Sequence, residues 1–238
     1  MLTHNLSFRK IFGTTGVRAD DDYTGQILVK GLEPNTRYEY QVRFKSVWGN
    51  KSEIAVGRFK TALKKRQKQP VKIAWSGDFG GQNVCRDSKL GFPIFDAIYQ
   101  EDADLFIGLG DMIYADNTCE AVGKFGNRQV PGDFIQSADL ANFWAHWRYA
   151  REDAAFQKLL SSTPYYGIWD DHEVVNDFGP LQDTRDSAPY SAAVHLLPMG
   201  LKAFLDYTPI RKSQRTPNRL YRNIRWGKHL ELFFLDNR

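Results

Sequence analysis

The stretch DLFIGLGDMIY, residues 104–114, carries the pattern that decides the fold of this chain. Its short apolar run, LFIGL, is followed at once by Gly110 and Asp111. A short continuous apolar run predicts a strand that is buried on both faces. The same order, an apolar strand and then an acidic residue, occurs in VKIAWSGD (71–78) and in YYGIWDDHE (165–173). We therefore expect three buried strands, each followed directly by carboxylates.

Helical patterns separate these strands. The segment PIFDAIYQ (93–100) opens with proline, which suits the first position of a helix. Residues 137–160 carry apolar side chains at spacings of three and four, which predicts one helix with Ser137 as its N-cap. The residues of that apolar face are Leu140, Phe143, Trp144 and Trp147. Strands that alternate with helices predict a layered α/β domain over residues 71–238.

The first sixty residues read as β structure. Residues 26–32, 37–47 and 54–62 are rich in β-branched and aromatic side chains and are separated by turn residues. The stretch LEPNTRY (32–38) resembles the entry to a late strand of a fibronectin type III sandwich, in which a tyrosine hydroxyl returns to the backbone just upstream. Such a module needs about 100 residues. We expect a partial fibronectin type III-like domain over residues 1–62 and a charged linker, LKKRQKQP, over 63–70.

The C-terminal part combines a predicted hairpin with a basic stretch. Residues 220–226 and 229–235 flank a Gly-Lys pair and predict two antiparallel strands. Residues 211–228 hold seven basic residues and no acid, so the rest of the chain has a net charge of 4 − 7 = −3. We interpret this stretch as a solvated face, with attraction of anionic ligands as the alternative. It matches no named nucleic-acid module, and no sequence-specific nucleic-acid partner is expected.

Composition excludes several classes of protein. The chain has 238 residues, of which 42% are hydrophobic and 25% charged, and these proportions exclude a disordered or collagenous chain. No apolar run approaches the roughly 20 residues of a membrane span, and the first residues lack the apolar stretch of a secretory signal. Two cysteines are too few for a disulfide-built scaffold.

The three acidic clusters predict a metal site. In open α/β sheets, ligands bind outside the carboxyl ends of the strands, so the clusters are expected to converge there. Carboxylates that close repel one another unless they are protonated or bridged by a cation. Oxygen and nitrogen ligands suit iron, manganese, zinc, calcium or magnesium. Each residue alone has an ordinary explanation, such as a turn residue for Asp78. The joint occurrence of all three clusters favours the metal.

Two motifs resemble a known group of enzymes. Gly110-Asp-x-x-Tyr114 is similar to a hallmark of purple acid phosphatases and calcineurin-like metallophosphoesterases. The stretch WDDHEVVND (169–177) is similar to the PhoD-like alkaline phosphatases, as is LDNR (235–238). The resemblance implies a layered metallophosphoesterase-type sheet and helices, incomplete at the C-terminus because the family's chain continues further. It also agrees with a β domain ahead of the catalytic one.

The resemblance assigns a role to each candidate residue. It implies that Asp78 holds the first metal, that Asp111 bridges two metals and that Tyr114 completes the first site. It implies that Asp171 binds the second metal and that His172 is catalytic, facing the leaving group or a phosphate oxygen. The implied contacts to substrate are Asn176 and Arg238. Spacing alone leaves open whether Asp170 or Asp171 points inward. Many members of this group have a cysteine where this chain has Asp78. The aspartate in this position favours ligation of the metal by oxygen.

The expected function is metal-dependent hydrolysis of a small phosphate ester, as an alkaline phosphatase or a phosphodiesterase. The resemblance implies two or more metal ions, iron with calcium, zinc, manganese or magnesium, and a metal-bound hydroxide as the attacking group. It suggests an extracellular, periplasmic or cell-surface location. We expect this chain to be a truncated fragment of the full enzyme, without a complete active site of its own. The alternatives are another binuclear metallohydrolase and a non-catalytic binding module.

The two cysteines allow two states. Cys85 lies seven residues after Asp78, and Cys119 lies eight residues after Asp111. Both loops leave neighbouring strand ends, so a disulfide across the rim of the site is one interpretation. Two reduced, partly buried thiols are the other.

Overall fold

The computed structural model describes residues 13–178, 181–185, 188, 191–211 and 215–236. Its elements, in chain order, are a short 3-10 helix η1 (Ala19–Asp21), β1 (Arg37–Val42), β2 (Ala55–Lys60), β3 (Ile73–Ser76), α1 (Pro93–Gln100), β4 (Leu105–Gly108), α2 (Leu140–Arg151), α3 (Ala154–Leu160), β5 (Tyr165–Gly167), β6 (Gln182–Asp183), β7 (Ser191–Ala192), α4 (Leu197–Tyr207), β8 (Arg222–Trp226) and β9 (Leu230–Phe234).

The three predicted strands form one parallel sheet. Its order is β3-β4-β5, with Ile73 opposite Leu105 and Phe106 opposite Tyr165. The central strand β4 is buried along its whole length, as its apolar run predicts. Strand β3 is only partly buried, and Trp75 is 65% exposed. The expectation that all three strands are buried is therefore wrong for β3, because it lies at the edge of the sheet among the described residues.

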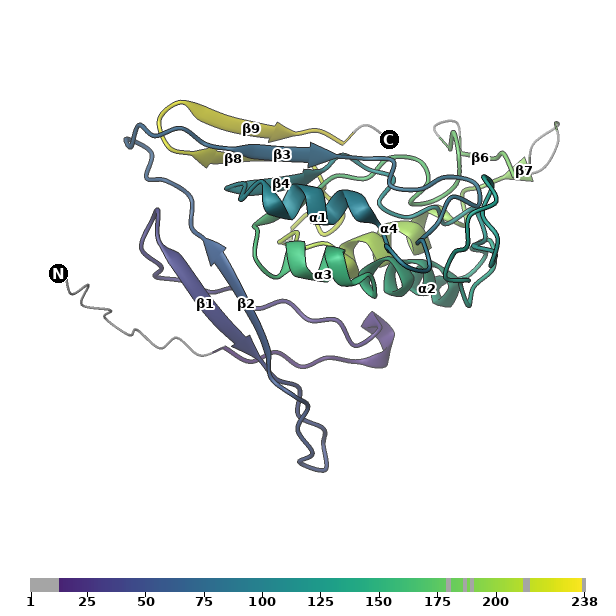
Figure 1. The fold of residues 1–238 in the computed structure, drawn as a ribbon, viewed down its shortest axis with the longest axis horizontal. Coiled ribbons are helices and arrows are strands. Elements are labelled where there is room, and N and C mark those ends of the chain that lie inside the picture. Colours follow the sequence, from purple (N-terminus) through teal and green to yellow (C-terminus); the bar gives the residue numbers. More distant parts are fainter. Residues whose placement is uncertain (1–12, 179–180, 186–187, 189–190, 212–214, 237–238) are drawn as a thin grey trace.

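Side chains that alternate along β4 bind two different layers to the sheet. Leu105 and Ile107 pack in a cluster with Trp226 and Phe234 of the β8–β9 hairpin. Phe106 packs in the larger cluster formed with the helices. The hairpin therefore covers one face of the sheet, and the helices cover the other (Figure 1). The predicted hairpin is confirmed, with its two strands paired in register around Gly227.

The N-terminal β structure is a single antiparallel pair of strands. Strands β1 and β2 pair from Arg37 opposite Lys60 to Val42 opposite Ala55. The Tyr38 hydroxyl accepts a 2.8 Å hydrogen bond from the backbone N–H of Glu33, which is the upstream contact expected of this tyrosine. Residues 26–32 form no strand, contrary to the sequence prediction. β-branched composition favours an extended chain, but a strand also needs a paired neighbour, and none pairs with this segment in the described chain.

The predicted helix over residues 137–160 is two helices, α2 and α3. Asp153 separates them, since its backbone is extended and its carboxylate accepts 2.8 Å and 3.0 Å hydrogen bonds from the N–H groups of Phe156 and Phe92. The N-cap of α2 is Asp139, whose side chain accepts from the N–H of Asn142, and not Ser137. Ser137 is fully buried, with its hydroxyl 3.2 Å from the His146 ring. Two aspartate N-caps thus start two separate helices in a segment whose apolar periodicity predicted one helix.

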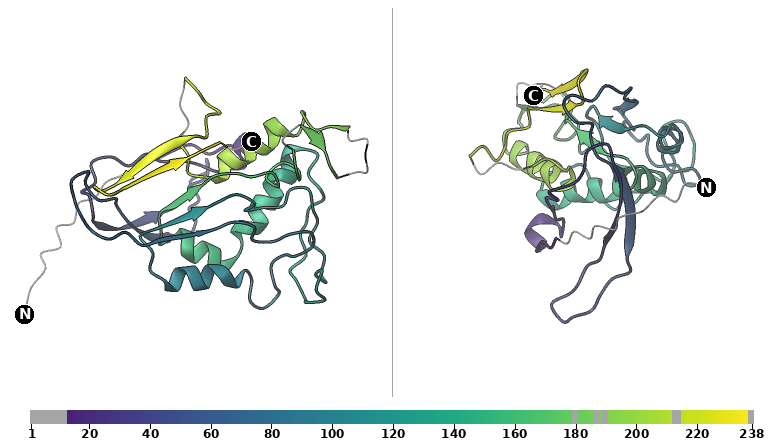
Figure 2. Two further views of the ribbon diagram at one scale, coloured as in Figure 1. Left: turned by 90° about the horizontal axis from the view of Figure 1, so that it is seen from above. Right: turned by 90° about the vertical axis from the view of Figure 1, so that its left-hand side faces the viewer.

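Ion pairs tie the N-terminal segment to the helices. The Asp22 carboxylate accepts hydrogen bonds of 2.7 Å and 2.6 Å from Arg148 of α2. Lys202 of α4 contacts Asp21 at 2.8 Å and Asp206 at 2.9 Å. These contacts hold η1 against the helices, and the purple helix lies next to them in the right-hand view of Figure 2.

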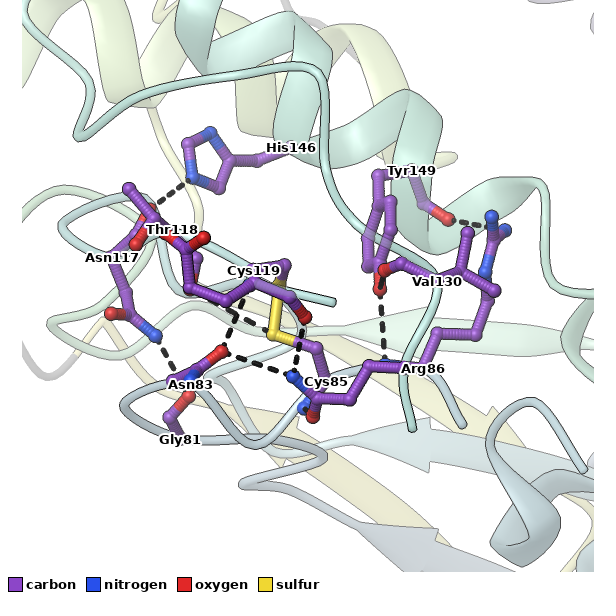
Figure 3. The surroundings of a disulfide bond; sticks show 12 residues. Gly81, Asn83, Cys85, Arg86, Asn117, Thr118, Cys119, Val130, His146 and Tyr149 are labelled. Carbon is purple, nitrogen blue, oxygen red and sulfur yellow. Dashed lines mark hydrogen bonds between the residues drawn. A yellow bond between two sulfur atoms is a disulfide. The ribbon is translucent and has the colours of Figure 1, made fainter. Parts of the chain in front are cut away.

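A disulfide joins the loop after β3 to the loop after β4. Cys85 and Cys119 are bonded, with their Cα atoms 5.8 Å apart, so the thiol alternative does not hold in this structure. Figure 3 shows the surroundings of this disulfide. Gln129 accepts a 2.6 Å hydrogen bond from the Cys85 N–H. Asn83 accepts from the N–H of Glu120 and from the Gln129 amide. Covalent and polar bonds therefore fix the two loops to each other.

Among the described residues, no helix is both long and apolar enough to cross a membrane.

Reduction of the disulfide is expected to destabilise the fold measurably. The two cysteines are 34 residues apart, and closing a loop of that length is worth about 2–4 kcal/mol through the unfolded chain. We expect the free energy of unfolding, measured by urea titration, to fall by this amount with reductant. The Cys85→Ser/Cys119→Ser double variant should match the reduced parent and ignore reductant. Equal stability of reduced and oxidised parent would contradict the expectation.

Candidate metal centre

Two Gly-Asp turns lie side by side at the carboxyl ends of β3 and β4. Asp78 and Asp111 have left-handed backbones with nearly equal φ angles of 52° and 51°. The N–H of Phe79 lies 3.4 Å from the carbonyl oxygen of Asp111. Gly110 has φ 101°, and a Cβ added there would come within 2.5 Å of the Asp170 Cβ. Glycine is therefore required before Asp111, because the loop after β5 passes directly over it.

A buried carboxylate, that of Glu173, organises the loops after β4 and β5. Glu173 is 0% exposed and accepts hydrogen bonds from the backbone N–H groups of Asp111 (3.1 Å), Met112 (2.8 Å) and Asp170 (2.8 Å). Burial raises its pKa to about 8, against the lowering effect of these three N–H groups. One side chain thus binds the backbone of the loop after β4 and the backbone of the loop after β5, and the candidate site lies between these two loops.

Three buried side chains bring ligand atoms together at this point. Asp111, Asp171 and His172 each offer one ligand atom, and these atoms all lie within 4.8 Å of one another. The three residues are 5%, 7% and 8% exposed. Asp171 is further fixed by a 2.6 Å hydrogen bond from the N–H of Asp177 to its carboxylate. Residues 60 positions apart in sequence thereby share one small, nearly dry volume.

The His172 ring is oriented by a second buried carboxylate. Its Nδ1 lies 2.8 Å from Oδ1 of Asp116, which is 6% exposed. The other oxygen of Asp116 accepts a 3.0 Å hydrogen bond from the N–H of Asn176. With Nδ1 engaged, Nε2 is the ring nitrogen left to face a ligand.

Charge and burial oppose each other strongly at this site. Burial raises the pKa of Asp111 to about 7, and the charges of Asp171 and Asp170 add to the rise. Burial alone would lower the pKa of His172, but the hydrogen bond and charge of Asp116 outweigh burial and raise that pKa to about 9. Carboxylates packed this closely repel one another when they are ionised, and a bound cation would offset that repulsion.

Tyr114 and Asp78 flank this group. The Tyr114 ring lies against the His172 ring, with the centroids 4.2 Å apart. Burial raises the pKa of the Tyr114 hydroxyl, and the charges of Asp111 and Asp78 raise it further. Asp78 itself is exposed and is not one of the three residues whose ligand atoms converge. It lies on the neighbouring turn, at the edge of the buried group.

The remaining candidates fall outside the convergent group. The Asn176 amide donates a 2.8 Å hydrogen bond to Asp177, so its side chain is engaged next to the group and not within it. Asp171, and not Asp170, is the aspartate of this pair whose carboxylate joins Asp111 and His172. Arg238 lies outside the described residues.

The sequence analysis missed two residues that build the site, Asp116 and Glu173. Glu173 stands inside the quoted motif, and Asp116 comes five residues after Asp111. Neither has a spacing that distinguishes it from a solvated acid. Their role depends on burial, which the sequence pattern around them did not reveal.

The donor set fits a hard or borderline metal ion. Two carboxylates and one imidazole converge, and imidazole and carboxylate ligands suit zinc, iron or manganese. Asp116 fixes the orientation of the His172 imidazole beside the two carboxylates. Burial, with the charges of Asp171 and Asp170, raises the pKa of Asp111 although the charge of His172 lowers it, and strongly shifted pKa values of this kind cluster at functional sites.

Several known proteins are similar to this chain. Residues 73–238 match the model of the PhoD-like phosphatase family. Alkaline phosphatase D of Bacillus subtilis (strain 168) is 28% identical over 241 residues, an alignment that covers 97% of this chain and 38% of that protein. A solved structure of PhoD has a TM-score of 0.75 at 27% identity and covers 98% of this chain and 44% of the solved chain. This chain thus spans less than half the length of these relatives.

The fold also extends to a second group of phosphatases. The structure of purple acid phosphatase PPD1 from yellow lupin (Lupinus luteus) seeds has a TM-score of 0.52 at 17% identity, covering 84% of this chain and 30% of the solved chain. At that identity the likeness concerns the fold alone. The family model, in contrast, matches most of the chain, from the start of β3 onward. The chain belongs to the PhoD-like phosphatase family.

Proposed function

We propose that this chain contributes the metal-binding part of a phosphate ester hydrolase. The observation that carries the proposal is the convergence of Asp111, Asp171 and His172 within 4.8 Å, at the carboxyl edge of the parallel sheet. Membership in the PhoD-like phosphatase family supports the reaction class. The substrate class is a small phosphate ester, and monoester and diester hydrolysis are both compatible with the site.

In this proposal the residues of the site have different roles. Asp111 and Asp171 hold metal, and Asp78 and Tyr114 border a second position, so the proposed centre is binuclear. His172, with Nδ1 held by Asp116, presents Nε2 to the leaving group and donates a proton or hydrogen bond to the departing oxygen. The hydrogen bond and charge of Asp116 raise the pKa of His172, which favours the protonated ring that this role requires. When bound, the metal ions supply charge neutralisation for the phosphoryl oxygens and an activated water.

Two further assignments belong to this proposal. The β1–β2 pair, with the Tyr38 contact, supports a partial fibronectin type III-like domain over residues 1–62, followed by the 63–70 connector. The disulfide supports a location outside the reducing cytoplasm, because disulfides persist in oxidising compartments.

Replacing Asp111 by Asn is expected to weaken metal binding by about tenfold or more, since the variant loses a charged ligand of a buried site. Titration calorimetry with Mn²⁺ on the 238-residue chain measures this directly, independently of turnover. Asp133→Asn is the matched control, because Asp133 is an exposed carboxylate in the same loop. Equal Mn²⁺ affinity of Asp111→Asn and the control would overturn the proposed site.

Replacing His172 by Asn is expected to lower aryl phosphate hydrolysis by about 10²–10⁴-fold relative to the metal-loaded parent, while the metal stays bound. Asp116→Asn should cost about 10–100-fold, because it loosens the ring orientation and removes a charge that raises the pKa of His172. Rates are compared at equal metal occupancy, measured by elemental analysis. Loss of metal from His172→Asn would show that the imidazole is a ligand and would contradict its assignment as the acid.

The stability of the metal-free protein is expected to fall as pH rises from about 5 to about 9. Folded Asp111 and Glu173 retain protons up to about pH 7 and about pH 8, whereas the unfolded chain loses them near pH 4. Folded His172 likewise stays protonated to about pH 9, against 6.5 for the ordinary group. The folded state therefore binds more protons across this range, and the free energy of unfolding decreases with pH.

Urea unfolding in the presence of chelator, repeated across this pH range, measures the trend. Asp111→Asn should show a shallower decrease, since one of the three titrations is removed. Saturating Mn²⁺ should oppose the decrease, because it favours the ionised site. Stability that rises with pH in chelator would contradict the assignment.

A further inference from the structure

The loop end of the β1–β2 hairpin projects away from the sheet and helices. We call residues 43–53 the hairpin tip; it is the far end of the β1–β2 pair in Figure 1 and points away from the body again in the right-hand view of Figure 2. The tip is ordered by backbone hydrogen bonds, from Ser46 N–H to Asn50 (2.8 Å) and from Ser52 N–H to Phe44 (3.0 Å). It therefore presents a defined surface.

The turn at the end of the tip has unusual residues at its centre. The Gly49 N–H donates a 3.0 Å hydrogen bond to the Ser46 carbonyl, which places Val47 and Trp48 at the two central turn positions. Glycine, proline, asparagine, aspartate and serine dominate such positions. Here the side chains are apolar, and they are 91% and 86% exposed. Two adjacent, protruding apolar side chains indicate a contact surface.

Basic side chains lie directly behind this apolar turn. Lys45 and Lys51 face each other in an antiparallel bridge, and like charges placed directly opposite destabilise a β pair. Arg43 adds a third positive charge, and Glu53 is the one acid of residues 43–53. Within the described part of the chain, none of the three basic residues forms an ion pair. An anionic partner would satisfy all three.

We propose that the hairpin tip binds the surface of an anionic lipid bilayer. The order of groups along the tip matches the order of layers in a membrane: Val47 and Trp48 at the far end reach the interface, and the basic residues set back from it reach the headgroup phosphates. Tryptophan favours this interface, and each basic residue near an anionic surface adds to binding. A protruding apolar point suits insertion, whereas a protein interface usually uses a broader patch.

The proposed attachment is peripheral and sensitive to salt. The tip carries three basic residues and one acid, so electrostatic attraction supplies part of the binding and weakens as ionic strength rises. The inference does not depend on the activity of the metal centre.

Vesicle co-sedimentation of the 238-residue chain tests the proposal. We expect binding to vesicles of mixed phosphatidylcholine and phosphatidylglycerol at low salt, and little binding to phosphatidylcholine alone. Trp48→Ser should weaken binding about tenfold or more, through loss of buried apolar area. The Lys45→Gln/Lys51→Gln double variant should weaken it by a similar factor and flatten the salt dependence. Phe125→Ser is the matched control, because Phe125 is an equally exposed aromatic (79%) in a different turn.

Three results would overturn the proposal: no sedimentation with anionic vesicles, equal sedimentation of Trp48→Ser and Phe125→Ser, or binding that ignores phosphatidylglycerol and salt. Analytical ultracentrifugation without lipid distinguishes the other class of partner. Self-association that Trp48→Ser abolishes, in a chain that does not bind vesicles, would assign the tip to a protein contact and would also overturn the proposal.

Discussion

The hydrogen bonds of the Glu173 carboxylate are the interaction on which the rest of the site depends. Glu173 is fully buried, and its two oxygens hold backbone N–H groups at the start of the loop after β4 and in the loop after β5. A buried carboxylate is costly unless it is hydrogen-bonded, and three donors reduce that cost. The same contacts place Asp111 and Asp171 within reach of each other. One unexposed side chain therefore converts two separate strand ends into one site.

This arrangement disfavours the ionised form of the carboxylates in the site. Asp111 resists ionisation because it is buried and because Asp171 and Asp170 lie nearby. His172 is held in the opposite state, protonated, by Asp116. The site is thus a region of unbalanced negative charge that favours protons when no cation is present. Metal binding and folding stability are coupled through the same residues, since a cation and protons compete for the same oxygens.

Two kinds of restraint keep the site loops in place on a small parallel sheet. The helices and the β8–β9 hairpin clamp β4 from both faces, with Phe106 on one side and Leu105 and Ile107 on the other. Beyond the strand ends, the disulfide and the Gln129 contacts join the two loops that carry Asp78 and Asp111. The hairpin tip has no such cover. Its exposed Trp48 and its facing lysines lie where neither the core nor the site uses them.

The sequence by itself determined the three strands of the parallel sheet, helix α1, the C-terminal hairpin and the identity of the acidic strand ends, but not β6, β7 or α4. These features depend on local periodicity and on the position of carboxylates after apolar runs, which a linear pattern contains. It did not find the break at Asp153, where the side chain caps α3 through the nearby N–H of Phe156 and also accepts from the N–H of Phe92, 61 positions away. It also could not separate Asp171 from Asp170 or reveal Asp116 and Glu173 as buried partners. Only the tertiary structure decides these points, because burial and cross-loop hydrogen bonds arise when distant segments pack together, and the same acidic residue in water would have no such partner.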